Sequence, residues 1–236
     1  MLNKRFNFFD VIFFITLIIC IVMSITMEKE KLLYISPIVV VTILIKYIST
    51  VKKNANPLFI IVLLMLIVLN YLAIYSFEKY FAIITLITCA YLVLYSVILK
   101  KYIYKFHLKR IISLSVIIGC LLVGYIIYSV IDLILSYIPE FTTLYVLLCA
   151  ACLFIYAAIS ATIYLNNNYN NTVIILASCI ATIFNIAISP INEFYFYNRT
   201  FTVLILTSHF LSIYLFMKFI SETNPEDKKD IDANYF

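Results

Sequence analysis

Eight apolar stretches, separated by short polar turns, dominate the sequence. They cover residues 8–27, 32–48, 57–76, 81–99, 111–137, 142–165, 172–191 and 201–220. Each is close to the roughly 20 residues that an α-helix needs to cross a bilayer. With 65% hydrophobic and 12% charged residues, the chain is too apolar for a water-soluble domain. The pattern therefore predicts an all-α, polytopic transmembrane helical bundle of eight spans, which forms one domain over residues 1–220.

The basic residues predict the orientation of this bundle. The stretch from Lys100 to Arg110 holds five of the seventeen Lys and Arg residues and no acid. In an eight-span map, thirteen basic residues flank the side that carries this loop and both termini, and four flank the other side. Because Lys and Arg concentrate in cytoplasmic loops, we expect a cell-membrane protein with both termini in the cytoplasm. The polar tail, residues 221–236, is expected to be disordered.

The net charge of +5 comes mainly from these flanks, so the predicted partners are membrane lipids with anionic headgroups and not nucleic acid. Only Gly119 and Gly124 occur, which excludes a glycine-rich phosphate loop, and GxSxG and HExxH motifs are absent. Cys149 and Cys152 form a CxxC pair without a second Cys or His pair nearby. We therefore expect no cofactor and no metal, and the sequence carries no signal for an oligomeric state.

Polar residues inside the spans share a depth. Asn70, Asp132 and Asn185 lie five or six residues before the outer ends of their spans, and His209 lies about eight residues after an outer start. At about 1.5 Å per residue, they form a layer roughly 8–12 Å below the outer surface. Intramembrane polar groups are candidates for function, and a shared depth lets them meet. With Tyr91, these residues predict a cavity that opens toward the outer leaflet.

Each of these residues has a plainer alternative interpretation. Asn70 and Asn185 are equally consistent with hydrogen bonds that hold neighbouring helices together. Asp132, a carboxylate inside a span, is expected to be a neutral proton donor if it is buried, or an interfacial group if it lies beside Tyr137. For His209, a neutral histidine that is hydrogen-bonded within the bundle is the favoured interpretation.

Spans three and four resemble spans seven and eight. Asn70 and Asn185 each precede a glutamate by eight residues, and residues 88–95 (TCAYLVLY) align with residues 207–214 (TSHFLSIY). Because four spans separate the two halves, such a repeat of spans 1–4 and 5–8 would be parallel, about an axis along the membrane normal. Chance similarity in a chain rich in Tyr, Leu and Ile is the alternative explanation.

The spans, the Ser36-Pro37 pair and the stretch FNIAISPINEFYF (residues 184–196) with the span that follows it resemble the YhhN family of membrane lysoplasmalogenases. The resemblance covers nearly the whole chain in plan. It implies hydrolysis of the vinyl-ether bond of a lysoplasmalogen, which gives a fatty aldehyde and a glycerophospho-headgroup. Such an ether-bond hydrolase needs an acid to protonate the enol ether and a base to deliver water.

The chain departs from the family at the positions that matter most. The family's Gly-Asp and Ser-Asp pairs fall here on Leu69-Asn70 and Asn185-Ile186, and its His-x-x-Tyr falls on Thr88 and Tyr91. Asparagine can hydrogen-bond, but it can neither protonate an enol ether nor act as a base.

Two hypotheses about the catalytic activity of this chain follow from the resemblance. The chain is a catalytically silent relative, or Asp132 and His209 act as its catalytic groups while Asn70, Tyr91 and Asn185 bind the substrate. The alternatives from other classes are a non-enzymatic membrane protein that binds or transports a lipid or small solute, and a structural or assembly partner.

Overall fold

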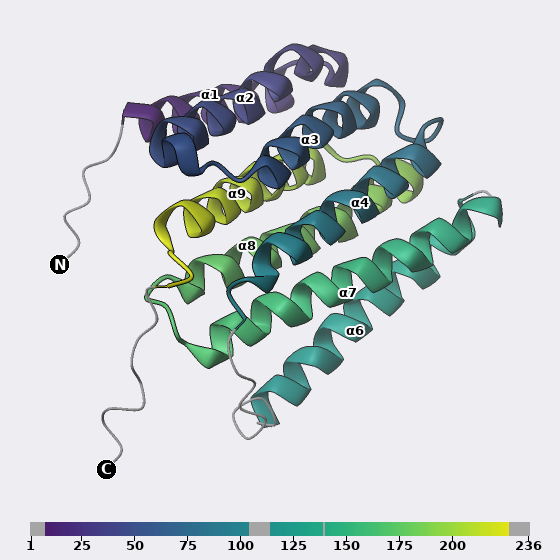
Figure 1. Ribbon diagram of the computed structural model, residues 1–236. Coiled ribbons are helices and arrows are strands. Elements are labelled where there is room, and N and C mark those ends of the chain that lie inside the picture. Colours follow the sequence, from purple (N-terminus) through teal and green to yellow (C-terminus); the bar gives the residue numbers. More distant parts are fainter. Residues whose placement is uncertain (1–7, 104–113, 139, 227–236) are drawn as a thin grey trace.

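A computed structural model gives the fold of this chain, and it describes residues 8–103, 114–138 and 140–226. Long α-helices dominate these residues, and four short helices, of which η4 has π geometry, lie at the connections (Figure 1). The long helices are α1 (Phe8–Thr26), α2 (Leu32–Val51), α3 (Pro57–Ser76), α4 (Phe81–Lys100), α6 (Leu114–Leu135), α7 (Thr143–Asn166), α8 (Thr172–Pro190) and α9 (Arg199–Glu222). The short helices are η1 (Lys29–Lys31), η2 (Lys52–Asn54), η3 (Glu140–Thr142) and η4 (Ile191–Tyr195).

The predicted helical membrane bundle is confirmed in its class. Seven helices in the described part of the chain are long and apolar enough to cross a membrane, with mean hydropathies from 1.8 to 2.8. The helix α6 falls outside these seven because its apolar stretch there, Leu121–Leu135, is shorter. The eight-span count therefore remains a prediction. Most of the basic loop before Arg110 and most of the polar tail lie outside the described residues.

Asparagine side chains define where several helices begin and end. The Asn56 side chain accepts a hydrogen bond from the Leu58 backbone N–H (3.0 Å), and Pro57 follows at the first helical position of α3. Asn198 caps α9 in the same way, through the Thr200 N–H (2.8 Å). At the end of α7, Asn167 adopts the left-handed conformation (φ 49°) that asparagine tolerates better than most residues. The short polar turns therefore set the helix bounds.

Seven long helices pack around a ring. In order around it, α1, α2, α3, α4, α7, α8 and α9 each contact the next, and α9 contacts α1 to close the ring. The remaining long helix, α6, lies outside the ring and packs against α7, α8 and η4, as its place at one edge in Figure 1 shows. Side chains directed toward the middle of this ring therefore come from helices that are far apart in the sequence.

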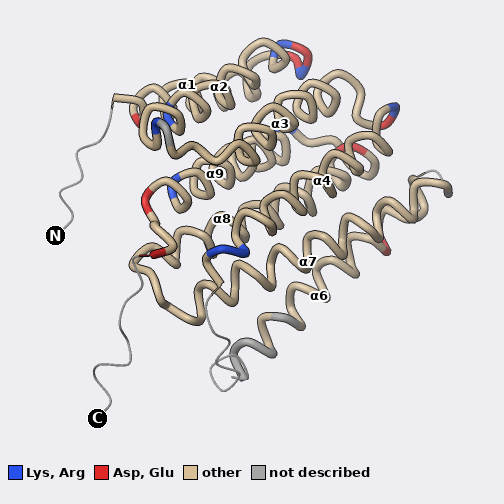
Figure 2. Tube along the Cα trace, in the orientation of Figure 1, with Lys and Arg blue, Asp and Glu red and all other residues tan. Residues whose placement is uncertain are grey.

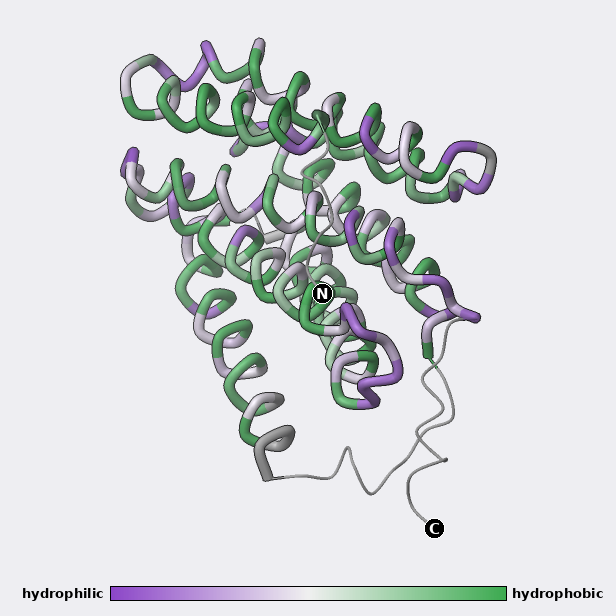
Figure 3. Tube along the Cα trace, turned by 90° about the vertical axis from the view of Figure 1, so that its left-hand side faces the viewer, coloured by the Kyte–Doolittle hydropathy of each residue, from purple (hydrophilic) through white to green (hydrophobic). Residues whose placement is uncertain are grey.

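The bundle has two polar ends and an apolar middle. Figure 2 shows most charged residues near the ends of the helices, and Figure 3 shows hydrophobic residues along the helices between them. We call one end the Glu193 end, and it carries the connections at residues 27–31, 77–80, 136–142 and 191–198. The opposite end, which carries the connections at residues 52–56 and 167–171, is called the Lys46 end.

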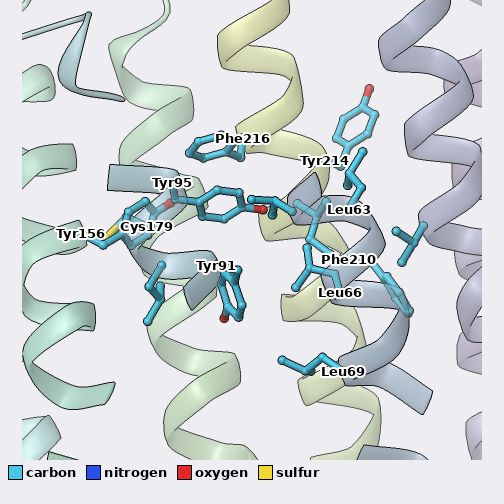
Figure 4. Close-up of a cluster of buried hydrophobic side chains, with 14 of the residues drawn as sticks. Leu63, Leu66, Leu69, Tyr91, Tyr95, Tyr156, Cys179, Phe210, Tyr214 and Phe216 are labelled. Atoms are coloured by element: carbon cyan, nitrogen blue, oxygen red, sulfur yellow. The ribbon is translucent and has the colours of Figure 1, made fainter. Parts of the chain in front are cut away.

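Stacked aromatic rings fill the middle of the ring of helices. Tyr95 of α4 stacks on Phe216 of α9, with ring centroids 3.8 Å apart, and Phe59 of α3 stacks on the same Phe216 at 5.7 Å. Tyr156 of α7 completes the group, with its ring 5.7 Å from Tyr95. Figure 4 shows Tyr95 and Phe216 together, with Tyr91 on the side where Leu69 lies. The rings close the interior between the two ends of the bundle.

Candidate functional site

A cavity of about 180 Å³ lies toward the Glu193 end, where helices of the ring and α6 border it. Residues of α2, α3, α4, α6, α7, α8, α9, η1 and η4 form its wall. Most of this wall is aliphatic or aromatic. Its polar members are Lys29, Asn70, Thr85, Thr88, Tyr91, Asn185, Ser189, Asn192, Glu193, Thr202 and His209. An apolar cavity with a few polar groups is the usual form of a small-molecule or lipid site.

The cavity brings together four of the five site residues that the sequence predicts. Asn70 of α3, Tyr91 of α4, Asn185 of α8 and His209 of α9 all line it, and all four are buried. The shared depth was therefore informative for these helices, because each side chain also faces the middle of the ring. Both asparagines of the predicted repeat line the same cavity, although the repeat itself remains a prediction.

Asp132 does not join these four residues. It is exposed on α6, whereas α6 lines the cavity through aliphatic side chains that include Ile127, Ile131 and Ile134. These three positions recur at helical spacing on one face, and Asp132 lies about 100° further around the helix than Ile131. The expectation that all five side chains share one cavity therefore holds for four of them and not for Asp132.

Asn185 and His209 form a hydrogen bond across α8 and α9. The Asn185 Nδ2 and His209 Nδ1 atoms are 3.1 Å apart, and the Ser189 hydroxyl approaches Asn185 Oδ1 at 3.4 Å. Because an amide nitrogen only donates, this arrangement makes Nδ1 the acceptor and assigns the histidine proton to Nε2. His209 is thus a neutral imidazole whose Nε2–H is a donor.

Two buried donors on the cavity wall lack a partner among the described residues. They are Nδ2 of Asn70 and Nε2 of His209. Asn70 is 7% exposed and His209 is 5% exposed. A buried donor that makes no hydrogen bond costs about 1–3 kcal/mol. By contrast, Thr85 and Thr88 donate to carbonyl oxygens of their own helix at 2.8 Å, so they need no further acceptor.

An ion pair lies at the Glu193 end of the cavity. Lys29 Nζ of η1 lies 2.6 Å from Glu193 Oε1 and 2.5 Å from Oε2 of η4, and both side chains line the cavity. Close to this pair in the sequence, the Arg199 guanidinium at the start of α9 donates to the Ile25 carbonyl near the end of α1 at 3.0 Å. The cavity wall is therefore mostly apolar, with several polar side chains along it and a pair of charges at one end.

A second buried polar cluster lies toward the Lys46 end, and the sequence-based candidates did not include it. Lys46 of α2 forms an ion pair with Asp10 of α1, and its Nζ lies 3.0 Å from the Tyr214 hydroxyl of α9. The Tyr214 hydroxyl also donates to Asp10 Oδ1 (2.5 Å). The signal was present in the sequence, because Lys46 and Asp10 both fall inside predicted spans, where charged residues need a partner.

No group of three or more His, Cys, Asp or Glu side chains is placed to hold a metal ion in the described part of the chain. Cys149 and Cys152 of α7 lie close to Cys89 of α4, and all three remain free thiols.

The apolar helices and the internal cavity define the class of this protein, which is a multi-pass integral membrane protein. Comparison with protein-family models, with curated proteins and with solved structures finds no match to this chain.

Proposed function

We propose that the protein binds an amphiphilic lipid, with the lipid's hydrogen-bond acceptor group inside the cavity. The observation that carries this proposal is the pair of unpartnered donors, Asn70 Nδ2 and His209 Nε2, on a mostly apolar wall. A ligand oxygen that accepts from either donor removes the cost of leaving it unpaired. An ester, ether or carbonyl oxygen of a lipid provides such an acceptor beside a hydrocarbon chain.

The size and polarity of the cavity agree with this ligand. An apolar cavity of about 150 Å³ is known to hold benzene, so the 180 Å³ here accommodates a short segment of a lipid, not a whole one. The paired charges of Lys29 and Glu193 lie where a polar headgroup would leave the cavity. The hydrocarbon chain would contact the aliphatic part of the wall.

The test is a binding measurement on the purified protein in lipid nanodiscs. A fluorescent 1-acyl-lysophosphatidylcholine serves as the probe, and an alkane of the same chain length serves as a competitor without acceptor oxygens. We expect Asn70→Ala to weaken probe binding about tenfold, because one hydrogen bond to a buried donor is lost. Unlabelled lysophosphatidylcholine should compete with the probe far better than the alkane does.

Asn166→Ala is the matched control. Asn166 is also buried (5% exposed), and its amide atoms also lack partners among the described residues, but it lies at the opposite end of the bundle and does not line the cavity. Its substitution should leave probe binding unchanged. Equal losses in both variants would show that packing, and not the cavity donors, controls binding.

Vinyl-ether hydrolysis, as the YhhN resemblance implies, is the second candidate. What favours it is the presence of Glu193 and His209 on one cavity wall, since both residue types can transfer protons. In this reaction one water is consumed, and a fatty aldehyde and a glycerophospho-headgroup are released. The assay is aldehyde release from a lysoplasmalogen, with Glu193→Gln and His209→Gln as inactive variants. Lipid binding without aldehyde release would reject the hydrolase and leave the binding proposal standing.

A further inference from the structure

The segment η4 covers the Glu193 end of the cavity. It follows Pro190 directly, and its π geometry is closed by a hydrogen bond from the Phe196 N–H to the Ile191 carbonyl (3.0 Å). Short π segments of this kind are rare and often mark functional sites. Pro190 lines the cavity together with Asn192 and Glu193 of η4. A ligand that enters the cavity from this end would pass beside these η4 residues.

Successive side chains of η4 contact different parts of the bundle. Asn192 donates to the Thr202 hydroxyl of α9 at 3.2 Å, and Glu193 pairs with Lys29 of η1. The Phe194 ring lies 5.7 Å from Phe77 and 4.9 Å from Phe81, at the turn between α3 and α4. The Tyr195 ring lies 5.6 Å from that of Tyr137, just after α6.

These contacts differ in how firmly they hold. Asn192 is fully buried, and its side-chain oxygen also accepts a hydrogen bond from the Asn198 N–H (2.8 Å). This double attachment makes Asn192 the fixed point of the segment. The Lys29 and Glu193 side chains are 24% and 16% exposed, so water can reach and replace their ion pair. Among the polar contacts of η4, the Lys29–Glu193 pair is therefore the one that water can replace most readily, since the Asn192 contacts are buried.

We propose that η4 is a lid over the cavity and that the Lys29–Glu193 ion pair is its latch. The lid turns about Asn192 when the pair separates, and it opens the Glu193 end to the ligand. This inference rests on the proposed function in one respect, because a lid is needed only if the cavity takes up a ligand. The access route itself can be measured without any ligand.

The test uses a native cysteine as the reporter. Cys149 of α7 lines the cavity, whereas Cys20 and Cys179 are also buried but do not line it. The full-length protein in nanodiscs is treated with a trimethylammonium methanethiosulfonate reagent, whose charge keeps it out of the bilayer. Mass spectrometry then follows the modification of each thiol over time. We expect Glu193→Gln to accelerate modification of Cys149 about tenfold, because a charge-assisted hydrogen bond no longer holds the lid closed.

Two further variants make the result specific. Exchange of the two charges, with Lys29→Glu and Glu193→Lys together, should return the rate at Cys149 toward that of the wild-type protein. Glu30→Gln, which removes an exposed acid next to Lys29 that does not line the cavity, should leave the rate unchanged. Rescue by the exchange would separate a latch from a general loss of structure.

An unchanged rate at Cys149 in Glu193→Gln would overturn the lid, since the reagent would then not enter past η4. Faster modification of Cys20 and Cys179 as well would show that the variant unfolds, and it would also count against a latch. The lipid-binding assay is independent of both outcomes. If Asn70→Ala leaves lipid binding unchanged while Glu193→Gln exposes Cys149, the binding proposal fails and the lid stands.

Discussion

Lys46 is a charged residue inside a predicted membrane span, and its contribution to stability depends on its two partners, Asp10 and Tyr214. It is 7% exposed, it forms an ion pair with Asp10, and its ammonium group lies 4.4 Å from the centre of the Tyr214 ring. The three residues come from α1, α2 and α9, which are neighbours in the ring of helices. The cluster therefore fixes the N-terminal helix pair to the last helix by polar contacts that the bilayer does not weaken.

At the scale of single residues, we predict that substitutions of Lys46 and Asp10 have strongly non-additive effects on the free energy of unfolding. Lys46→Met alone should lower the free energy of unfolding by about 3 kcal/mol, because it removes the buried cation that is paired with the Asp10 carboxylate. Lys46→Met combined with Asp10→Leu should come within about 1 kcal/mol of the wild-type protein, since neither charge then remains. Equilibrium unfolding in mixed detergent and SDS micelles measures both values.

Lys79→Met is the control for this cycle. Lys79 is exposed in the turn between α3 and α4, so its substitution should change stability by less than about 0.5 kcal/mol. Strictly additive effects of Lys46→Met and Asp10→Leu would show that the two side chains do not stabilise the fold as a pair.

Single residues also show what the sequence could and could not predict about the site. Depth in the membrane follows from the position of a residue between two turns, and it correctly placed Asn70, Asn185 and His209 at the cavity. The direction in which a side chain faces follows from how its helix packs, and position along the helix does not determine that. Asp132 has the same predicted depth but faces away from the cavity.

At the scale of helices, α6 differs from the others because it lies outside the ring. Its predicted bounds, residues 111–137, extend beyond the observed Leu114–Leu135, and residues 111–113 lie outside the described part of the chain. For the remaining long helices, predicted and observed bounds agree within a few residues, since the turn residues that the sequence displays are also the ones that end the helices. The packing partners of α6 had no comparable signal, because most of its side chains are apolar.

The packing of α6 leads to a prediction about Asp132. Because α6 contributes aliphatic side chains to the cavity and Asp132 is exposed, Asp132→Asn should leave the affinity for the lysophosphatidylcholine probe within about twofold of the wild-type value. Ile131→Asn, one residue earlier on the face that lines the cavity, should weaken probe binding severalfold, since it replaces an apolar contact with a polar amide. Titration of the probe against each variant in nanodiscs gives the affinities. A loss of probe binding in Asp132→Asn would show that the Asp132 carboxylate does belong to the binding site.

At the scale of the whole molecule, the aromatic rings of Tyr95, Phe216 and Phe59 divide the interior into two unequal parts. The cavity lies on the Glu193 side of these rings, and the Lys46 cluster lies toward the other end. Under the proposed function, this arrangement predicts that a ligand enters the cavity from the Glu193 end and does not extend past the stacked rings.

Which end of the bundle faces the cytoplasm then determines the leaflet from which the proposed lipid ligand would enter. Counting the basic residues around eight spans assigns the cytoplasm to the Lys46 end, although Lys46 itself, which contributes to that count, is buried and paired with Asp10. The difference in the number of basic residues between the two ends remains large without Lys46.

We therefore predict that reporter fusions after Arg110 and after Phe236 both give a cytoplasmic signal, and that a fusion within residues 77–80 gives an external one. Alkaline phosphatase and green fluorescent protein fusions at the three positions measure this directly. Opposite signals from Arg110 and Phe236 would mean that an odd number of spans separates them, so that α6 or one of the three helices after it does not cross the membrane, whereas matching external signals would place the cavity on the cytoplasmic side.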